Sequence, residues 1–221
     1  MLENYKKHVA ERAEQNIPPL PLDADQTSEL IELLKKDHQE SDFLLNLLKE
    51  RVPAGVDQAA YVKAAFLADI TTGKASSPYI TKIDAVKILG TMLGGYNIQP
   101  LIECLKDNEL AEAAAHVLSR TLLIFDAFNE IFELSKTNEH AKKVVEEWAN
   151  ATWFTEKTDI EEQIKLTVYK VTGEINTDDL SPAPDAWSRP DIPLHALAMF
   201  KMPRIGPVSY THLTLPTLAI V

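Results

Sequence analysis

The stretch DDLSPAPDAWSRPDIP, residues 178–193, combines prolines and carboxylates with a single basic side chain, Arg189. A guanidinium is a planar, permanently charged fork that can bind a carboxylate through two hydrogen bonds. Its neighbours in WSRPDIP, a tryptophan and a proline, would limit its freedom and lower the entropic cost of binding. The same composition allows a structural role, in which Arg189 pairs with Asp185 or Asp191 and ties down a proline-rich loop. From the residues alone the structural role is the simpler interpretation, and both stay open.

Other residues with catalytic potential give weaker signals. Asp178 and Asp179 are adjacent, and on an extended segment adjacent carboxylates point to opposite sides, which disfavours a shared metal or acid–base site. We expect residues 176–181 to satisfy turn backbone groups through side-chain hydrogen bonds instead. The histidines are dispersed without metal-binding spacing, and His116 is interpreted as a packed core or interface residue. Cys104, in the apolar segment PLIECLKD, is interpreted as a small buried hydrophobe.

Composition limits the possible partners and compartments. The formal net charge of −11 opposes non-specific attraction to nucleic acid or to an anionic membrane. Lysines are scattered among acids, as in KKDHQE and AKKVVEEW, which indicates solvated helix faces with i,i+4 pairs. No run approaches the roughly 18 apolar residues that span a bilayer, and the amphipathic N-terminus lacks the apolar core of a secretory signal. A single cysteine fits a reducing compartment, so we expect a cytoplasmic protein.

The pattern is helical up to about residue 158. Apolar residues recur at helical spacing in six segments separated by short breaks, without intervening strands. This arrangement predicts a mainly α-helical domain whose helices stack pairwise, as an irregular, HEAT-like array. The segments are residues 24–37, 41–50, 57–73, 81–107, 109–136 and 138–154.

Helix ends are predicted from capping residues. Asp23 or Asp25 is placed to cap the first of these helices, Ser41 the second and Asp57 the third. Gly73 marks the end of that third helix.

The character of the sequence changes after residue 158. IKLTVYKVTGEINTDD alternates β-branched and polar residues and predicts a strand, and DIPLHALAMFKM returns to helical spacing. A second, α/β or β-rich domain therefore begins around residue 159. The uncharged end VSYTHLTLPTLAIV resembles the translation of a sequencing-adaptor read, so we interpret residues 208–221 as a non-native tail and recruit His212 into no site. A hydrophobic C-terminal strand is the alternative.

Three segments carry a resemblance to a known family. They are MLENYKKHVAERAEQNIPPLPLDADQ, LGTMLGGYNIQPLI and VTGEINTDDLSPAPDAWSRPDIPLHALAM. They resemble the bacterial bifunctional aconitate hydratases (2-methylisocitrate dehydratases) of the B type. The resemblance covers residues 1 to about 202. It implies a HEAT-like α-helical domain over residues 1–158 and the truncated start of an α/β swivel domain over residues 159–207, in an N-terminal piece of a longer chain.

The resemblance also implies an activity. The family isomerises citrate and isocitrate through cis-aconitate, a hydro-lyase reaction of the tricarboxylic acid cycle, on a 4Fe–4S cluster held by three cysteines. Those cysteines and the catalytic residues belong to later domains, so this piece is expected to bind no cluster or metal and to be inactive alone. The resemblance places a substrate-contacting arginine at Arg189, where it would bind a carboxylate of the tricarboxylate.

Two other functions follow from the same resemblance. The helical domain is an alternative candidate for a protein-interaction module, and the family implies homodimerisation through it. RNA binding by cluster-free protein is a third candidate, which the acidic charge of this piece disfavours.

Overall fold

The computed structural model describes residues 1–14, 19–121, 127–156, 163–165, 168–171, 175–183, 195–196, 198–199 and 211–214. These residues form a mainly α-helical structure, as the sequence predicts. The helical elements up to residue 156 are α1 (Leu2–Glu14), α2 (Ala24–Leu34), α3 (Ser41–Asn46), the π-helical turn η1 (Leu47–Arg51), α4 (Gln58–Thr72), α5 (Lys82–Leu89), α6 (Ile98–Cys104), α7 (Ala111–Leu118), α8 (Phe128–Leu134), α9 (Glu139–Ala149) and α10 (Thr152–Thr155).

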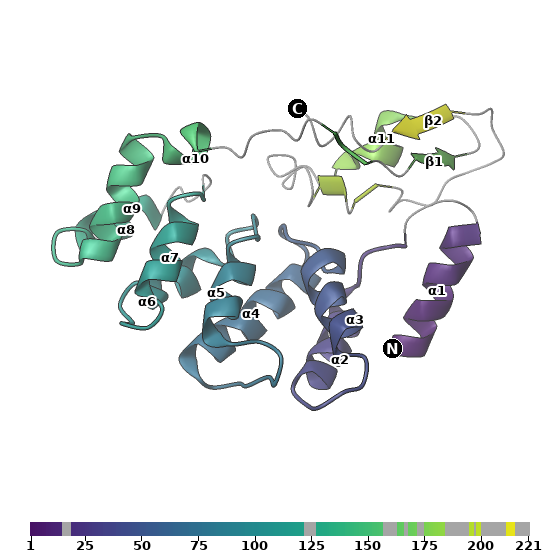
Figure 1. Ribbon diagram of the computed structural model, residues 1–221, viewed down its shortest axis with the longest axis horizontal. Helices are drawn as coiled ribbons and strands as arrows, with labels where there is room; N and C mark the ends of the chain where they lie inside the picture. The colour runs from purple at the N-terminus through teal and green to yellow at the C-terminus, as the bar shows by residue number, and fades with distance from the viewer. Residues whose placement is uncertain are drawn as a thin grey trace.

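The helices pack in series. Helix α2 packs on α4, α4 on α5, α5 on α7, and α7 on α9, so each of the inner helices lies between two others. We call these five helices the helical row. Figure 1 shows the row crossing the molecule, with α1 at one end and α8–α10 at the other. Apolar faces buried between successive helices form one continuous core along the row.

Local side-chain chemistry fixes most of the predicted helix ends. Asp23 forms a capping box with Gln26 at the start of α2, and the Asp57 carboxylate accepts a hydrogen bond from the Ala59 amide at the start of α4. Gly73 ends α4 in a left-handed conformation with φ of 75°. The predicted Ser41 cap is wrong. Helix α3 starts at that residue, and the preceding cap position makes no side-chain hydrogen bond, because its first turn begins directly from a tight bend.

Two interhelical loops meet by backbone contact. The Leu93 amide donates to the Ala54 carbonyl at 2.8 Å. A Cβ atom at Gly94 would lie 1.9 Å from the Gly55 carbonyl oxygen, so only glycine permits this approach. The turn at Gly94–Gly95 thus joins the α5–α6 loop to the loop between η1 and α4.

Helix α1 is held by a clamp around Pro19 and Leu20. The buried Tyr5 hydroxyl donates to the Leu20 carbonyl at 2.8 Å, and His8 Nε2 accepts from the Leu20 amide at 2.9 Å. Arg51 of η1 donates to the Pro19 carbonyl and, at 3.4 Å, to the Tyr5 hydroxyl. Burial, together with the nearby guanidinium groups, lowers the pKa of His8, which keeps its ring neutral and able to accept.

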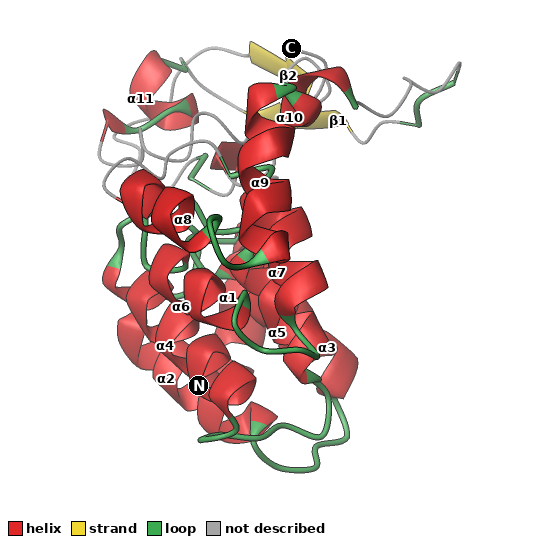
Figure 2. Cartoon of the chain, turned by 90° about the vertical axis from the view of Figure 1, so that its left-hand side faces the viewer, coloured by secondary structure: helices red, strands yellow, loops and turns green. Residues whose placement is uncertain are grey.

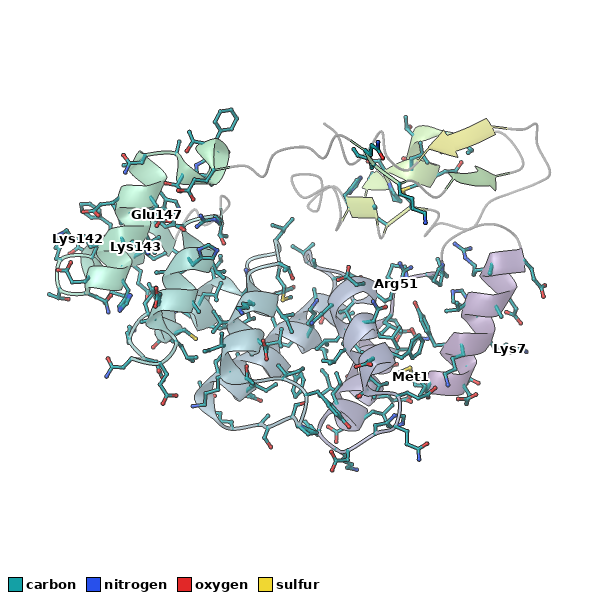
Figure 3. All side chains as sticks on the ribbon, in the orientation of Figure 1. Met1, Lys7, Arg51, Lys142, Lys143 and Glu147 are labelled. Carbon is teal, nitrogen blue, oxygen red and sulfur yellow. The ribbon has the colours of Figure 1, made fainter. Side chains whose placement is uncertain are left out.

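Charged side chains cover the outside of the row as predicted. Figure 3 labels Lys142, Lys143 and Glu147 on α9, where Lys143 lies 3.9 Å from Glu147 at i,i+4 spacing. Arg120 also reaches Glu147, at 3.4 Å. Exposed pairs of this kind contribute at most about 1 kcal/mol each. They keep the surface solvated, while the buried apolar faces hold the helices together.

Among the residues described beyond position 163 are two strands and a short helix. Strands β1 (Val168–Val171) and β2 (Thr211–Thr214) pair antiparallel, with Val168 opposite Thr214, and α11 (Thr177–Leu180) lies between them in the sequence. Figures 1 and 2 both place these elements on one side of the helical row. The predicted strand near residue 168 is confirmed. Strand β2 falls within residues 208–221, whose non-native origin stays a prediction.

Lys63 is a buried charge that the sequence pattern did not reveal. Its side chain is fully buried in α4, and Nζ lies 3.5 Å from the Lys49 carbonyl of η1. Burial lowers the pKa of Lys63 from 10.5 to about 8, against the opposing influence of Glu50. The ammonium form therefore destabilises the fold at neutral pH.

This burial predicts a rise in stability at alkaline pH. Between about pH 8 and 10.5 the unfolded chain binds the Lys63 proton more tightly than the folded chain, so the free energy of unfolding should increase with pH in that window. The shift corresponds to about 3 kcal/mol. Urea unfolding from pH 7 to 10 measures it, and Lys63→Met should be more stable at pH 7 and lose this rise. The exposed Lys74→Met is the control, and an equal change in both variants contradicts the assignment.

Candidate functional site

Arg189, the predicted substrate-binding residue, lies outside the described residues, as do Asp185 and Asp191, the two candidate ion-pair partners. The structure describes the chain on both sides of it, at residues 175–183 and 195–199 except Leu197. The candidate site is therefore built from these two flanks.

The N-terminal flank is a capped helical turn. Asn176 Oδ1 accepts from the Asp179 amide at 2.9 Å, and the Asp179 carboxylate accepts from the Asn176 amide at 3.0 Å. This reciprocal pair starts α11, so the predicted satisfaction of turn backbone groups is confirmed. The expectation of an extended segment at Asp178 and Asp179 is wrong, because the capping box favours a helical turn. Asp179 is engaged by the backbone and is not one half of a paired acid–base site.

A hydrogen bond joins the C-terminal flank to the N-terminal flank. His195 Nε2 lies 2.9 Å from Ser181 Oγ, although fourteen residues separate them in the sequence. Beyond His195, the buried residues Ala198 and Met199 form a turn in which the Ala198 amide donates to the His195 carbonyl at 3.0 Å. The two ends of the segment that carries Arg189 are thus side by side.

The described residues offer no metal-binding cluster. Among the parts of the chain that the structure describes, no group of three or more histidine, cysteine or carboxylate side chains is placed to hold an ion. Cys104 is the only cysteine in the sequence, and burial raises the pKa of its thiol. A neutral, buried thiol is a poor metal ligand, and one cysteine cannot supply the three thiolates of an iron–sulfur cluster.

Histidines take individual structural roles. His8 and His38 each accept a backbone amide hydrogen bond, from Leu20 and Glu40 respectively. The core interpretation of His116 is wrong, because this residue is exposed on α7. The buried residues of α7 face the neighbouring helices, whereas the helical period places His116 on an exposed side.

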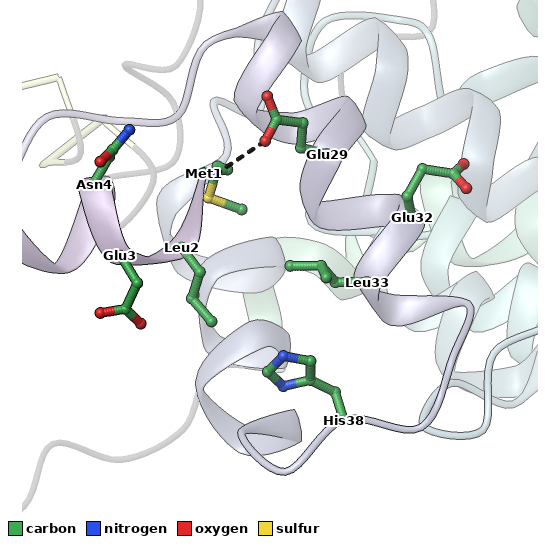
Figure 4. A pocket seen from close by; sticks show the side chains of 8 residues that line it. All are labelled: Met1, Leu2, Glu3, Asn4, Glu29, Glu32, Leu33 and His38. Atoms are coloured by element: carbon green, nitrogen blue, oxygen red, sulfur yellow. Dashed lines mark ion pairs between the residues drawn. The ribbon is translucent and has the colours of Figure 1, made fainter.

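A groove that the sequence did not predict lies between the start of α1 and α2. Its volume is about 460 Å³, and Figure 4 shows Leu2 and Leu33 facing it. Its carboxylates are already paired. Glu29 lies 3.1 Å from the Met1 amino group, and Glu32 lies 2.6 Å from Lys35. The acidic edge of the groove is therefore neutralised by neighbouring amines.

Partly exposed aromatic side chains lie on α8, α9 and α10, at one end of the helical row. Phe128 and Phe132 of α8 are 44% and 45% exposed and stack with ring centroids 6.1 Å apart. Phe128 also stacks on Trp148 of α9 at 5.9 Å, and Phe154 of α10 is 57% exposed. We call Phe128, Phe132 and Trp148, which stack on one another, the aromatic surface. The sequence signal for this surface is the aromatic content of the 109–136 and 138–154 segments.

Comparison with known proteins places the chain in a family. Residues 4–154 match the family profile described as the aconitate B N-terminal domain, and residues 166–214 match that of the aconitate hydratase 2 N-terminus. The chain belongs to the aconitate hydratase B family. It corresponds to the N-terminal part of these proteins, as the resemblance in its sequence indicated.

Several relatives named aconitate hydratase B show the same correspondence. The chain is 60% identical over 208 residues to that of Escherichia coli K12, covering 93% of this chain and 24% of the relative. It is 57% identical to the Synechocystis protein, covering 92% of this chain, and 50% identical to that of Helicobacter pylori, covering 90%, with 24% of each relative covered. The chain therefore spans about a quarter of the length of these proteins.

Among the described residues, no helix is long and apolar enough to cross a membrane.

The cap at Asn176 gives a prediction for the site. Asn176→Ala removes the acceptor for the Asp179 amide and should destabilise α11 by about 1 kcal/mol. Amide hydrogen exchange at Asp179 should accelerate accordingly. Asn176→Asp keeps an acceptor at the same position and should preserve protection. Unchanged exchange in the alanine variant would show that α11 does not depend on this cap.

Proposed function

We propose that this chain is the N-terminal part of an aconitate hydratase that interconverts citrate and isocitrate through cis-aconitate in the tricarboxylic acid cycle. The observation that carries the proposal is the family match over residues 4–154 and 166–214. The single cysteine supports a cytoplasmic location.

The role proposed for Arg189 is to bind a carboxylate of the tricarboxylate substrate. A guanidinium fork matches a carboxylate with two parallel hydrogen bonds, and its charge does not depend on pH in the physiological range. The described residues on both sides of the segment make hydrogen bonds, between Asn176 and Asp179 and between Ser181 and His195.

The chain's residues do not fit the cofactor that the family implies. A 4Fe–4S cluster supplies a Lewis acid for the substrate hydroxyl and needs three cysteine thiolates. Cys104, the only thiol, is buried in α6. The cluster and the catalytic residues accordingly belong to the later domains of the longer polypeptide, and the isolated chain is inactive. What this chain supplies is substrate binding and the placement of its domains.

The domain assignment is part of the same proposal. Residues 1–158 form a HEAT-like domain, residues 159–207 begin a swivel domain, and residues 208–221 are a non-native tail, of which residues 208–214 fall within the family match. Serial packing of short helices from α2 to α9 supports the first assignment. The β1–α11 segment, with its strand followed by a capped turn, supports the second.

A conservative substitution tests the role of Arg189. In the full-length polypeptide that carries this segment, Arg189→Lys keeps the charge and loses the planar fork, so KM for citrate should rise about tenfold, the cost of one charge-assisted hydrogen bond. Steady-state kinetics measure it. Arg120→Lys, which alters an arginine paired to Glu147 and Glu156 in the helical row, is the control. Unchanged kinetics in Arg189→Lys would reject the substrate role.

A second function, homodimerisation through the helical domain, is favoured by the aromatic surface. Its rings are partly exposed at the end of the row, although aromatic side chains contribute most to stability and binding when they are buried. Aromatic residues are also enriched in the cores of protein–protein interfaces. RNA binding has less support, since the chain carries a net charge of −11.

Disruption of the aromatic surface tests this second function. Phe132→Glu places a charge in the stacked pair and should raise the dimer dissociation constant at least about tenfold, because an unpaired charge would be buried on association. Light scattering across a concentration series measures it. Ile83→Glu, at a similarly exposed apolar residue of α5, is the matched control. If the unmodified chain is strictly monomeric, or if Ile83→Glu weakens dimerisation as much as Phe132→Glu does, the proposal is wrong.

A further inference from the structure

Helix α1 is attached to the helical row through a narrow contact. Of the residues in α1, all of which the structure describes, Tyr5 alone is buried, and Leu2 and Val9 pack against the core while staying partly exposed. Polar side chains of α1 complete the contact at the backbone of Leu20. We propose that His8 is an acid-sensitive latch, which holds α1 on the row when its ring is neutral and releases it when the ring takes up a proton.

The latch acts on the two peptide groups of Leu20. The Tyr5 hydroxyl donates to the Leu20 carbonyl at 2.8 Å, and His8 Nε2 accepts from the Leu20 amide at 2.9 Å. Leu20 lies on the row side of this contact, because the nearby Leu22 amide donates to the Arg51 carbonyl of η1 at 2.8 Å. The backbone around Leu20 is therefore tied to η1, and Tyr5 and His8 tie α1 to that backbone.

A proton on His8 would turn its hydrogen bond into a repulsion. The neutral imidazole accepts through the lone pair of Nε2, which requires its hydrogen to be on Nδ1. In the imidazolium both ring nitrogens carry a hydrogen, so both are donors. Nε2–H would then face the Leu20 N–H, and the amide would lose its acceptor at a half-buried position.

The charges around His8 also favour the neutral ring. Burial lowers the pKa of His8 from its ordinary value of 6.5, and the guanidinium groups of Arg12 on α1 and Arg51 on η1 lower it further, whereas Glu11 opposes them. The segment on the other side of the ring, residues 19–22 with the sequence PLPL, carries no ionisable side chain. An imidazolium here would add a positive charge beside two others.

The direction of the pH effect follows from these contacts. Above about pH 6.5 the ring is neutral whether α1 is docked or released, so docking does not depend on this proton. Below that value the released ring binds a proton more readily than the docked ring, so docking weakens as the pH falls. The weakening ends once the docked ring is protonated as well.

A second polar contact between α1 and the row does not follow this proton. Lys6 Nζ lies 2.6 Å from the Glu40 carboxylate. The hydrogen bond to Glu40, together with Glu3, raises the pKa of Lys6, so the ammonium keeps its charge throughout the window in which His8 titrates. Acid should therefore loosen the Leu20 contact first.

Hydrogen exchange and a ring titration in the unmodified chain test the latch. From about pH 7.5 to about pH 5, the protection factor of the Leu20 amide should fall about tenfold, the effect of losing one hydrogen bond beside like charges. Amides of α4 should keep their protection. The fall should begin near pH 6.5 and level off at the midpoint of the His8 ring titration, measured by NMR. Constant protection of Leu20, or a fall outside that window, overturns the latch.

Substitutions separate the latch from other effects of acid. His8→Gln keeps an oxygen that can accept from the Leu20 amide and cannot take up a proton, so Leu20 protection should no longer change with pH. His116→Gln, at an exposed histidine of α7, is the matched control and should retain the fall. If Leu20 protection falls in His8→Gln as it does in the unmodified chain, another group senses the acid and the latch is wrong. If His8→Gln does not fold, the titration of the unmodified chain decides.

Discussion

Helix α4 lies between α2 and α5, and eight of its fifteen residues are buried. A helix with so wide a buried face has no stable isolated form, because the apolar face must be covered on both sides. The same holds for α5 and α7 farther along. The stability of the row is consequently shared between neighbouring interfaces, and the loops and caps serve to set the position of each helix against the next.

Local chemistry made much of this architecture predictable. Asp23, Asp57 and Gly73 act on their own backbone neighbours, so their roles can be read from a few residues. The breaks between helices follow from the same signals. Strand β1 was predictable from alternation over a short run, and its partner β2 lies in the segment for which a C-terminal strand was the alternative interpretation. Most features that depend on adjacent residues were visible in the sequence, although the Ser41 cap and the helical turn at Asp178 and Asp179 were predicted wrongly.

The features that the sequence missed depend on distant partners. Lysine is usually a surface residue. Only the packing of η1 on α4 shows that the Lys63 amine is buried. The Ser181–His195 contact joins residues that no periodicity connects. The sequence predicted an extended segment at Asp178 and Asp179. Side-chain hydrogen bonds within residues 176–181 are compatible with a turn, but here they form a capping box that starts a helix. Arg189 was found through its neighbours in the sequence and the family, and its substrate role stays a proposal.

The two parts of the chain contribute differently to an enzyme of this family. The helical row has a continuous core and a charged outer face, whereas the part beyond residue 163 contributes short elements joined by polar contacts. In the function proposed above, the second part would contribute Arg189 to substrate binding, and the first part would contact a neighbouring subunit. Under that proposal both parts place groups, and the chemistry would be carried out by other domains.

Cys104 has a practical consequence. It is the only thiol in the chain, it is 4% exposed, and burial raises its pKa, so reagents that attack thiolates have no access to it in the folded state. Alkylation must wait until α6 separates from its neighbours. The labelling rate of this one sulfur atom thus measures how often the middle of the molecule opens under native conditions, without any engineered reporter.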